Sequence, residues 1–243
     1  MRAFRYYVRY WYALDLIIFV ILAGLCAYFW KDINVLQRLV WLNYLALFIH
    51  QAEEYGWPGG EPAIMNVVLR HSDLPDRFPL NQFSAMFTNT VWAFVAYFVP
   101  FFFPNVAWLL FMPLIMNIGQ FMVHGVMTNL QLRSIYNPGL GAVVFLHLPL
   151  TVYGFIYVIQ NHLIVGIDWL WCILTLMVVM MSLSVTTYIV LATRKSRWPF
   201  APEELQKFGL PEKAKRLGLD QPREEKGPLG LISRMQRKIH PND

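Results

Sequence analysis

The sequence predicts an all-α protein, a polytopic membrane bundle of about six transmembrane helices with both termini in the cytoplasm. Hydrophobic residues make up 57% of its 243 residues and charged residues only 14%, whereas about a quarter of residues are charged in soluble domains. The hydrophobic residues also gather in runs near 20 residues long, the length that a helix needs to cross a bilayer. Since lipid offers no partner for backbone amides, such unbroken runs are expected to be helices.

The runs follow one another along residues 1–193, which we expect to form one transmembrane helical domain. The first run is too long for a signal-peptide core and lacks a small-residue cleavage site, so we expect it to be retained. The predicted spans are Tyr12 to Trp30, Val35 to Tyr55, Phe83 to Phe103, Val106 to Met127, Gly139 to Ile159 and Ile167 to Ala192.

Positive charges predict the orientation of the bundle. Arg2, Arg5 and Arg9 precede the first run, and a basic segment follows the last at 194–197. Because Lys and Arg are enriched in cytoplasmic loops, an even number of crossings with both ends inside is expected. The predicted location is therefore the cytoplasmic (plasma) membrane.

The segment 194–243 differs sharply in composition from the rest of the chain. It holds twelve of the twenty Lys and Arg residues and seven of the fifteen acids, which accounts for the net charge of +5. We expect a basic cytoplasmic tail that is partly amphipathic or disordered and that lies near the anionic membrane surface. No nucleic-acid recognition motif accompanies the charge, so the bilayer is the expected partner and nucleic acid is not.

Ionisable residues inside the predicted membrane region indicate a functional site, because such residues are costly at that depth. His50-Gln51-Ala52-Glu53-Glu54 ends the second run. On a helix, Glu53 and Glu54 fall roughly 60° and 40° to either side of His50, so the three side chains can converge on one point. A metal ion is the expected occupant of that point.

Polar residues on the other runs fall at the same predicted inner level, so we expect them to surround a cavity in the inner leaflet. Two imidazoles and one carboxylate suit a catalytic zinc ion, with the second carboxylate as general base for a bound water. A further acid would favour iron or manganese, and the identity stays open among Zn, Fe and Mn. The predicted metal ligands are His50, Glu53, Glu54, His124 and Asp15, with Glu53 and Glu54 also predicted to be catalytic. The residues predicted to contact substrate or to support the ligands are Asn117, Gln120, Tyr136, Asn137 and His147.

Three short motifs together resemble a known family. They are His50-Gln51-Ala52-Glu53-Glu54, the isolated His124 and Tyr136-Asn137-Pro138-Gly139. They look like the HXXEE-motif family, integral membrane proteins of unassigned function that are similarly marked by a His-x-x-Glu-Glu motif, a further histidine and a Tyr-x-Pro-Gly motif. The resemblance would cover about residues 35–159 and implies sites rather than a reaction.

The sequence is compatible with two classes of function. The first is a membrane-embedded metal-dependent enzyme, hydrolytic or oxidative, acting on a lipid-like or isoprenoid substrate from the cytoplasmic leaflet. The alternative is a non-enzymatic protein, either an ion or small-molecule transporter or an assembly factor, and a transporter should extend its polar path into the outer leaflet. A purely structural His/Glu cluster would instead pair Glu53 and Glu54 with Arg or Lys.

Overall fold

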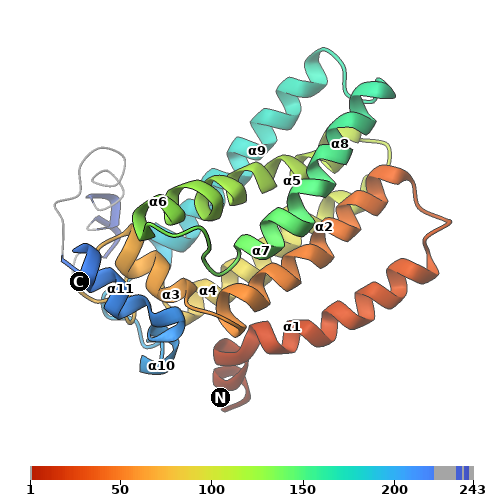
Figure 1. Ribbon diagram of the computed structural model, residues 1–243. Helices are drawn as coiled ribbons and strands as arrows, with labels where there is room; N and C mark the ends of the chain where they lie inside the picture. Colours follow the sequence, from red (N-terminus) through yellow and green to blue (C-terminus); the bar gives the residue numbers. More distant parts are fainter. Residues whose placement is uncertain (1, 222–233, 237, 241–243) are drawn as a thin grey trace.

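The protein is a bundle of long helices that run side by side (Figure 1). The computed structural model describes residues 2–221, 234–236 and 238–240. Every regular element within these residues is a helix, which confirms the all-α class and the membrane character of the chain. Five stretches are long and apolar enough to cross a membrane, and they are Arg2–Tyr28, Gln82–Phe102, Ala107–Leu132, Leu140–Gln160 and Ile167–Val190.

Most of these stretches are composite, because α-helix passes into wider π-helical or tighter 3₁₀ turns within one rod. The elements that build the bundle are α1 (Arg2–Tyr28), α2 (Val35–Gln51), η1 (Ala52–Gly56), α3 (Glu61–Ala63), η2 (Ile64–Leu69), α4 (Gln82–Phe87), η3 (Thr88–Trp92), η4 (Phe94–Phe98), η5 (Val99–Phe102), α5 (Ala107–Gln120), η6 (Phe121–Thr128), α6 (Asn129–Leu132), α7 (Leu140–Ala142), η7 (Val143–His147), α8 (Leu148–Gln160), α9 (Ile167–Val185) and η8 (Thr186–Val190).

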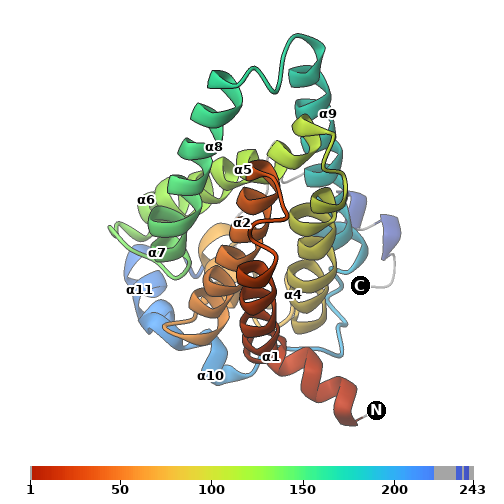
Figure 2. The same cartoon turned by 90° about the vertical axis from the view of Figure 1, so that its right-hand side faces the viewer.

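The second predicted span, Val35 to Tyr55, is also a helix, but it is not among the five apolar stretches. It consists of α2 and η1, and α2 packs against α1, α5 and α8. Figure 2 shows α2 between α4 on one side and α7 and α8 on the other. Asn43, His50 and Gln51 are buried on this helix. A helix surrounded by protein does not need a continuous apolar surface, which explains how α2 can carry buried polar side chains.

Local sequence signals define where these helices begin. Asn34 caps α2. Its side-chain oxygen accepts a hydrogen bond from the backbone N–H of Gln37, and the Gln37 side-chain oxygen accepts one from the backbone N–H of Asn34. Asn81 and Ser84 form the same reciprocal cap at the start of α4. Such caps satisfy backbone donors that the first helical turn leaves unpaired. The polar residues in these loops therefore fix the register of the rods that follow.

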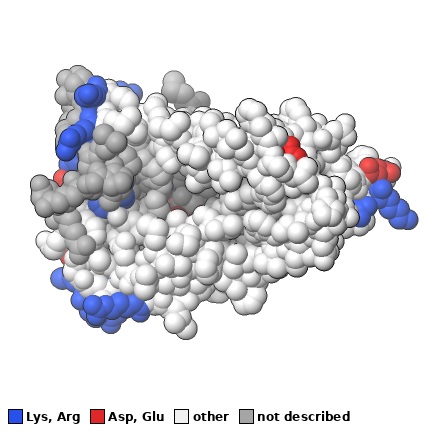
Figure 3. All heavy atoms as spheres, turned by 90° about the horizontal axis from the view of Figure 1, so that it is seen from above, with Lys and Arg blue, Asp and Glu red and all other residues white. Residues whose placement is uncertain are grey.

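Charged side chains gather at the two ends of the bundle, and the face in Figure 3 is almost free of charge between them. One end carries Lys31 and Asp32 between α1 and α2, and Asp168 at the start of α9. At the other end, Arg9 of α1 pairs with Glu203 of the tail at 2.7 Å, so the two terminal segments meet. An uncharged belt between two charged ends is the pattern of a bilayer-spanning protein.

The first part of the basic tail packs onto the bundle. It contains α10 (Pro202–Leu205), η9 (Lys207–Gly209) and α11 (Leu210–Leu217). Phe200 packs with Trp11 of α1, and Leu210 packs with Ile64. The Lys207 ammonium donates to the backbone carbonyls of Tyr55 and Gly56 at 2.6 and 3.0 Å. The tail is expected to be partly amphipathic or disordered. For residues 222–233, 237 and 241–243 this expectation lies outside the residues that the structure describes.

Candidate metal centre

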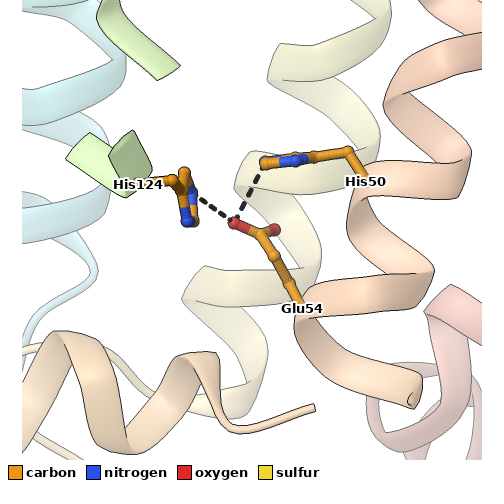
Figure 4. Close-up of side chains that lie close together, drawn as sticks. All are labelled: His50, Glu54 and His124. Carbon is orange, nitrogen blue, oxygen red and sulfur yellow. Dashed lines mark ion pairs between the residues drawn. The ribbon is translucent and has the colours of Figure 1, made fainter. Parts of the chain in front are cut away.

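Three buried side chains from two helices converge on one carboxylate oxygen (Figure 4). His50 lies at the end of α2 and Glu54 one turn later in η1, so both reach the same side of one rod. The Glu54 Oε1 lies 3.1 Å from the Nε2 of His50 and 3.1 Å from the Nε2 of His124, which η6 supplies. One donor atom from each residue lies within 4.8 Å of the others. The structure thus brings together three of the predicted ligands.

The protonation of the His50 ring follows from its second contact. Its Nδ1 lies 3.0 Å from the backbone carbonyl oxygen of Gly139. A carbonyl oxygen can only accept, so Nδ1 must carry the proton and donate it. In the neutral ring, Nε2 then presents a bare lone pair towards Glu54.

His124 is held in the same tautomer by Asn137. The Asn137 amide nitrogen donates to the backbone carbonyl of His124 at 2.6 Å and to the Asn129 side chain at 2.8 Å. Its oxygen, which lies 2.9 Å from the His124 Nδ1, is therefore an acceptor, and Nδ1 carries the proton. The neutral His124 ring also directs a bare Nε2 lone pair at Glu54.

Two imidazole lone pairs that face one carboxylate oxygen repel it unless positive charge lies between them, either as protons on the Nε2 atoms or as a metal ion. Ligands at about 2.0–2.2 Å from one tetrahedral ion lie about 3.3 Å apart, close to the two observed N–O distances of 3.1 Å. Metal-bound histidines usually donate their other ring N–H to an oxygen, as both rings do here. The free cysteines, Cys26 and Cys172, lie in the apolar core, so the donors are nitrogen and oxygen. The residues present fit a divalent ion such as Zn, Fe or Mn.

Glu53 has a different role, because both of its oxygens are already bonded. Oε1 accepts from the Tyr136 hydroxyl at 2.7 Å and from the Gly141 N–H at 2.9 Å, and Oε2 accepts from the Ala142 N–H at 2.8 Å. The carboxylate thus caps the first turn of the Leu140–Gln160 rod, where anions are favoured. The structure does not bring Glu53, predicted as ligand and catalyst, into the three-residue group.

The turn before α7 contributes Tyr136, which binds Glu53, and Gly139, which lies between the two histidine rings. Tyr136 donates to Glu53, and burial, followed by the carboxylate beside it, raises the pKa of Tyr136 above its usual range. The hydroxyl consequently stays a donor. Gly139 has φ of +97°, and a Cβ there would lie 2.7 Å from His124 Cε1 and 2.9 Å from His50 Cε1. Only glycine fits between the two imidazoles.

Two other predicted residues lie away from the group. Asp15 is buried on α1, where it acts electrostatically on Tyr7 and Tyr44 rather than joining the three ligands. Gln120, half-buried at the end of α5, lies beside the Tyr97 hydroxyl. The structure does not bring Asp15 to the three ligands, because equal depth on separate helices does not fix the direction in which a side chain points.

Below the group, His147 begins a buried polar network. Its Nδ1 lies 2.7 Å from Asn43 Oδ1, which also accepts from Asn117 at 2.9 Å. Asn117 donates in addition to Thr151 at 2.9 Å. The His147 ring centre lies 5.6 Å from that of His50. His147 thus lies next to His50, and Asn117 is connected to it through Asn43 and the His147 backbone carbonyl.

Glu61 is a site residue that the sequence reasoning missed. It opens α3, is buried, and has an Oε2 with no hydrogen-bond partner. Burial, followed by the negative charge of Glu54, raises the pKa of Glu61 well above its usual range, and His124 acts in the opposite direction. The available signal was an acid placed between Gly60 and Pro62, seven residues after Glu54.

Comparison with known proteins relates part of the chain to a protein family. Residues 41–154 match a family model described as "Protein of unknown function with HXXEE motif". This confirms the resemblance expected from the motifs, and the matched range contains His50 to Glu54, His124 and Tyr136 to Gly139. No curated protein and no solved structure matches the chain.

Proposed function

We propose, from the premise that residues 41–154 form an HXXEE-motif region, that the protein is a membrane-embedded metal-dependent enzyme. It would act hydrolytically or oxidatively on a lipid-like or isoprenoid substrate. His50, Glu54 and His124 would hold a zinc, iron or manganese ion. When bound, such an ion supplies Lewis acidity and lowers the pKa of a bound water, or supports oxidation.

One observation carries the proposal. Two imidazoles have their Nδ1 protons committed to oxygen acceptors, and both Nε2 atoms face the same carboxylate oxygen at 3.1 Å. A buried charge persists only when it is paired or coordinates a metal. A divalent ion satisfies the carboxylate and both lone pairs at once.

A purely structural cluster is the weaker explanation. It requires Glu53 and Glu54 to pair with Arg or Lys, but among the described residues neither has such an ion pair. Glu54 meets two imidazoles instead, and Glu53 meets a hydroxyl and two backbone amides. The acid that faces the histidines is thus free to serve as a ligand.

A transporter is also less well supported. The polar network ends at the level of Asn43 and Asn117. From there towards the opposite end, the interior is filled by one apolar cluster that includes Leu39, Leu110 and Phe111. A transported ion would need polar groups along this path. An enzyme needs access from one side only.

The surroundings of the site favour a lipid-like substrate from the cytoplasmic leaflet. Ile135, next to Tyr136, is 95% exposed, and Leu130 is 73% exposed. Apolar side chains exposed beside the motif turn suit contact with acyl or isoprenoid chains. The site also lies near the end where the basic tail packs, which the positive-inside rule assigns to the cytoplasm.

Metal analysis of the protein purified in lipid nanodiscs tests the proposal. After exposure to Zn, Fe or Mn and removal of free metal, we expect about one ion per chain, and loss of the ion in His50→Ala, His124→Ala and Glu54→Gln. His162→Ala is the matched control, because His162 is exposed between α8 and α9. Wild-type protein without metal, or metal that survives all three site substitutions, would contradict the proposal.

A further inference from the structure

We infer that Glu61 and His147 accept hydrogen bonds from the group bound at the ion's open position, and that this selects ligands carrying O–H donors. The inference rests on the proposed metal site. It assigns a ligand class to that site, namely water and lipid-like alcohols or diols rather than ethers or esters.

The His147 ring presents a buried acceptor. Its Nδ1 faces Asn43 Oδ1 at 2.7 Å, and the Asn43 amide nitrogen donates to the Pro113 carbonyl at 3.2 Å. The Asn43 oxygen is therefore the acceptor, so Nδ1 of His147 carries the proton. The Nε2 lone pair remains, and it has no hydrogen-bond partner within the described part of the chain. This side chain is completely buried.

Glu61 presents a second buried acceptor near the same group. The residue is only 5% exposed, and its Oε2 has no partner among the residues that the structure describes. It interacts electrostatically with both Glu54 and His124. Buried acceptors are almost always hydrogen-bonded, and an acceptor left without a partner destabilises the protein. Two orphans beside one ligand group indicate that a bound molecule completes them.

Charge and distance agree with this arrangement. A divalent ion held by the three ligands would favour the ionised form of the nearby Glu61. With the ion bound, the carboxylates of Glu54 and Glu61 together balance its charge, while the three imidazoles are neutral. A molecule bound to an ion at about 2.0–2.2 Å lies between the ion and the protein atoms that accept its hydrogen bonds. Those protein acceptors therefore lie farther from the ion than the metal ligands do. Glu61 and His147 indeed fall outside the group whose donor atoms lie within 4.8 Å of one another.

Both orphaned atoms accept, and this determines the ligand chemistry. Water or a 1,2-diol brings two O–H donors, a simple alcohol brings one, and an ether or ester brings none. A site built to bond a hydroxyl rejects the analogue that lacks it, because its own polar groups are then left unpaired. Affinity should follow the number of O–H groups.

A direct test uses Co²⁺ as a spectroscopic probe in nanodiscs. The Co²⁺-loaded protein is titrated with 1,2-decanediol, 1-decanol and 1-methoxydecane, and binding is followed by the visible absorption of cobalt. We expect affinity to decrease in that order, with the diol favoured over the ether by at least about tenfold. Equal affinities in a protein that holds cobalt would overturn the inference and leave the metal site intact.

Two variants locate the effect. In Glu61→Leu and His147→Phe, cobalt should remain bound while the preference for the diol falls to about twofold or less. Val152→Ala, at an exposed position of the same rod, and Glu203→Gln, a surface acid, should keep the wild-type preference. The order of ligand affinities in the wild-type protein and the effect of each variant are independent measurements. If one variant fails to fold, the other measurements still test the inference.

The outcomes separate this inference from the proposed function. Absence of cobalt from wild-type protein overturns both. Loss of cobalt in Glu61→Leu or His147→Phe, with Val152→Ala still loaded, would identify that residue as a metal ligand and overturn its role as an acceptor. Retained cobalt with a lost diol preference supports the inference.

Discussion

Gly139 shows how a single residue can control the geometry of a site that it does not ligate. Its carbonyl oxygen accepts from the His50 ring, and the position where a Cβ would stand is occupied by the His50 and His124 rings. Its φ of +97° is in addition strained for any other residue. One glycine therefore fixes both the tautomer of one ligand and the spacing of two.

Gly139→Ala should displace the imidazoles and weaken metal binding. We expect at least about tenfold lower affinity for Co²⁺ and a free energy of unfolding about 1–3 kcal/mol lower, because backbone strain adds to the clash. Titration with Co²⁺ and thermal unfolding measure the two effects. Gly119→Ala is the control, since nothing lies within 4 Å of a Cβ at that position. Equal affinity in both variants would contradict this role of Gly139.

Glu53→Gln should lower stability without removing the metal. The variant weakens a charged cap on the Leu140–Gln160 rod and the bond from Tyr136, together worth about 1–2 kcal/mol. Thermal unfolding followed by tryptophan fluorescence measures the loss, and metal content should stay near that of wild type. Tyr136→Phe removes one bond only, so its effect should be smaller. A metal-free but stable Glu53→Gln protein would show that Glu53 acts as a ligand.

At the scale of elements, the site lies where α-helix changes to π-helix. His50 lies in the last turn of α2, before η1, His124 lies within η6, and His147 ends η7. A π-helical turn is wider than an α-helical turn and shifts the side chains that follow it, and such turns are frequent at functional sites. The local irregularity of three rods thus accompanies the convergence of their side chains.

The tail segment α10 to α11 is attached through Lys207, and this attachment can be tested by proteolysis. Lys207→Met removes the donors to the Tyr55 and Gly56 carbonyls. We expect trypsin to cleave after Lys213 and Lys215 several-fold faster than in wild type, because local opening exposes the chain. Glu212→Gln, at an exposed position of α11, should leave the rate unchanged. An unchanged rate in Lys207→Met would show that apolar packing alone holds the segment.

The pair of Asp73 and Arg194 links the α3–α4 connection to the start of the tail. Arg194 donates to Asp73 at 2.6 and 3.0 Å, which lowers the pKa of Asp73. A lowered carboxylate pKa contributes stability above the unfolded value near 3.9, and this contribution is lost as pH falls through the folded value. Both side chains are partly exposed, so the contribution should stay below about 1 kcal/mol.

Asp73→Asn should consequently destabilise the protein slightly at pH 7 and less at pH 3. Thermal unfolding of wild type and variant at both pH values measures the difference, and added salt should reduce it at pH 7. A difference that is equally large at pH 3 would assign the effect to packing rather than charge.

At the scale of the whole molecule, α2 and the five apolar stretches together predict six crossings and both termini on the cytoplasmic side. His162→Cys, between α8 and α9, and Glu203→Cys, in α10, should react with a membrane-impermeant maleimide from opposite sides of sealed vesicles. The native cysteines are buried, which keeps the background low. Reaction of both from one side would contradict the six-crossing topology.

Much of the fold and part of the site were predictable from local sequence. Hydropathy gave the helices, and the i, i+4 spacing of His50 and Glu54 placed both side chains on one helix face. Asp15 could not be excluded, because the rotation of α1 about its axis depends on packing. The distinct roles of Glu53 and Glu54 were also hidden, since only the docking of the Leu140–Gln160 rod reveals which acid meets backbone amides.

The sequence by itself determined the membrane class, the helical content and the motif that contributes His50 and Glu54, because all three depend on composition or on spacing within one helix. Only the tertiary structure decided that His124 joins them, that Gly139 and Asn137 fix the two tautomers, and that Glu61 lies nearby. These contacts join segments far apart in the chain. Their geometry is set by how the rods pack, which no local pattern encodes.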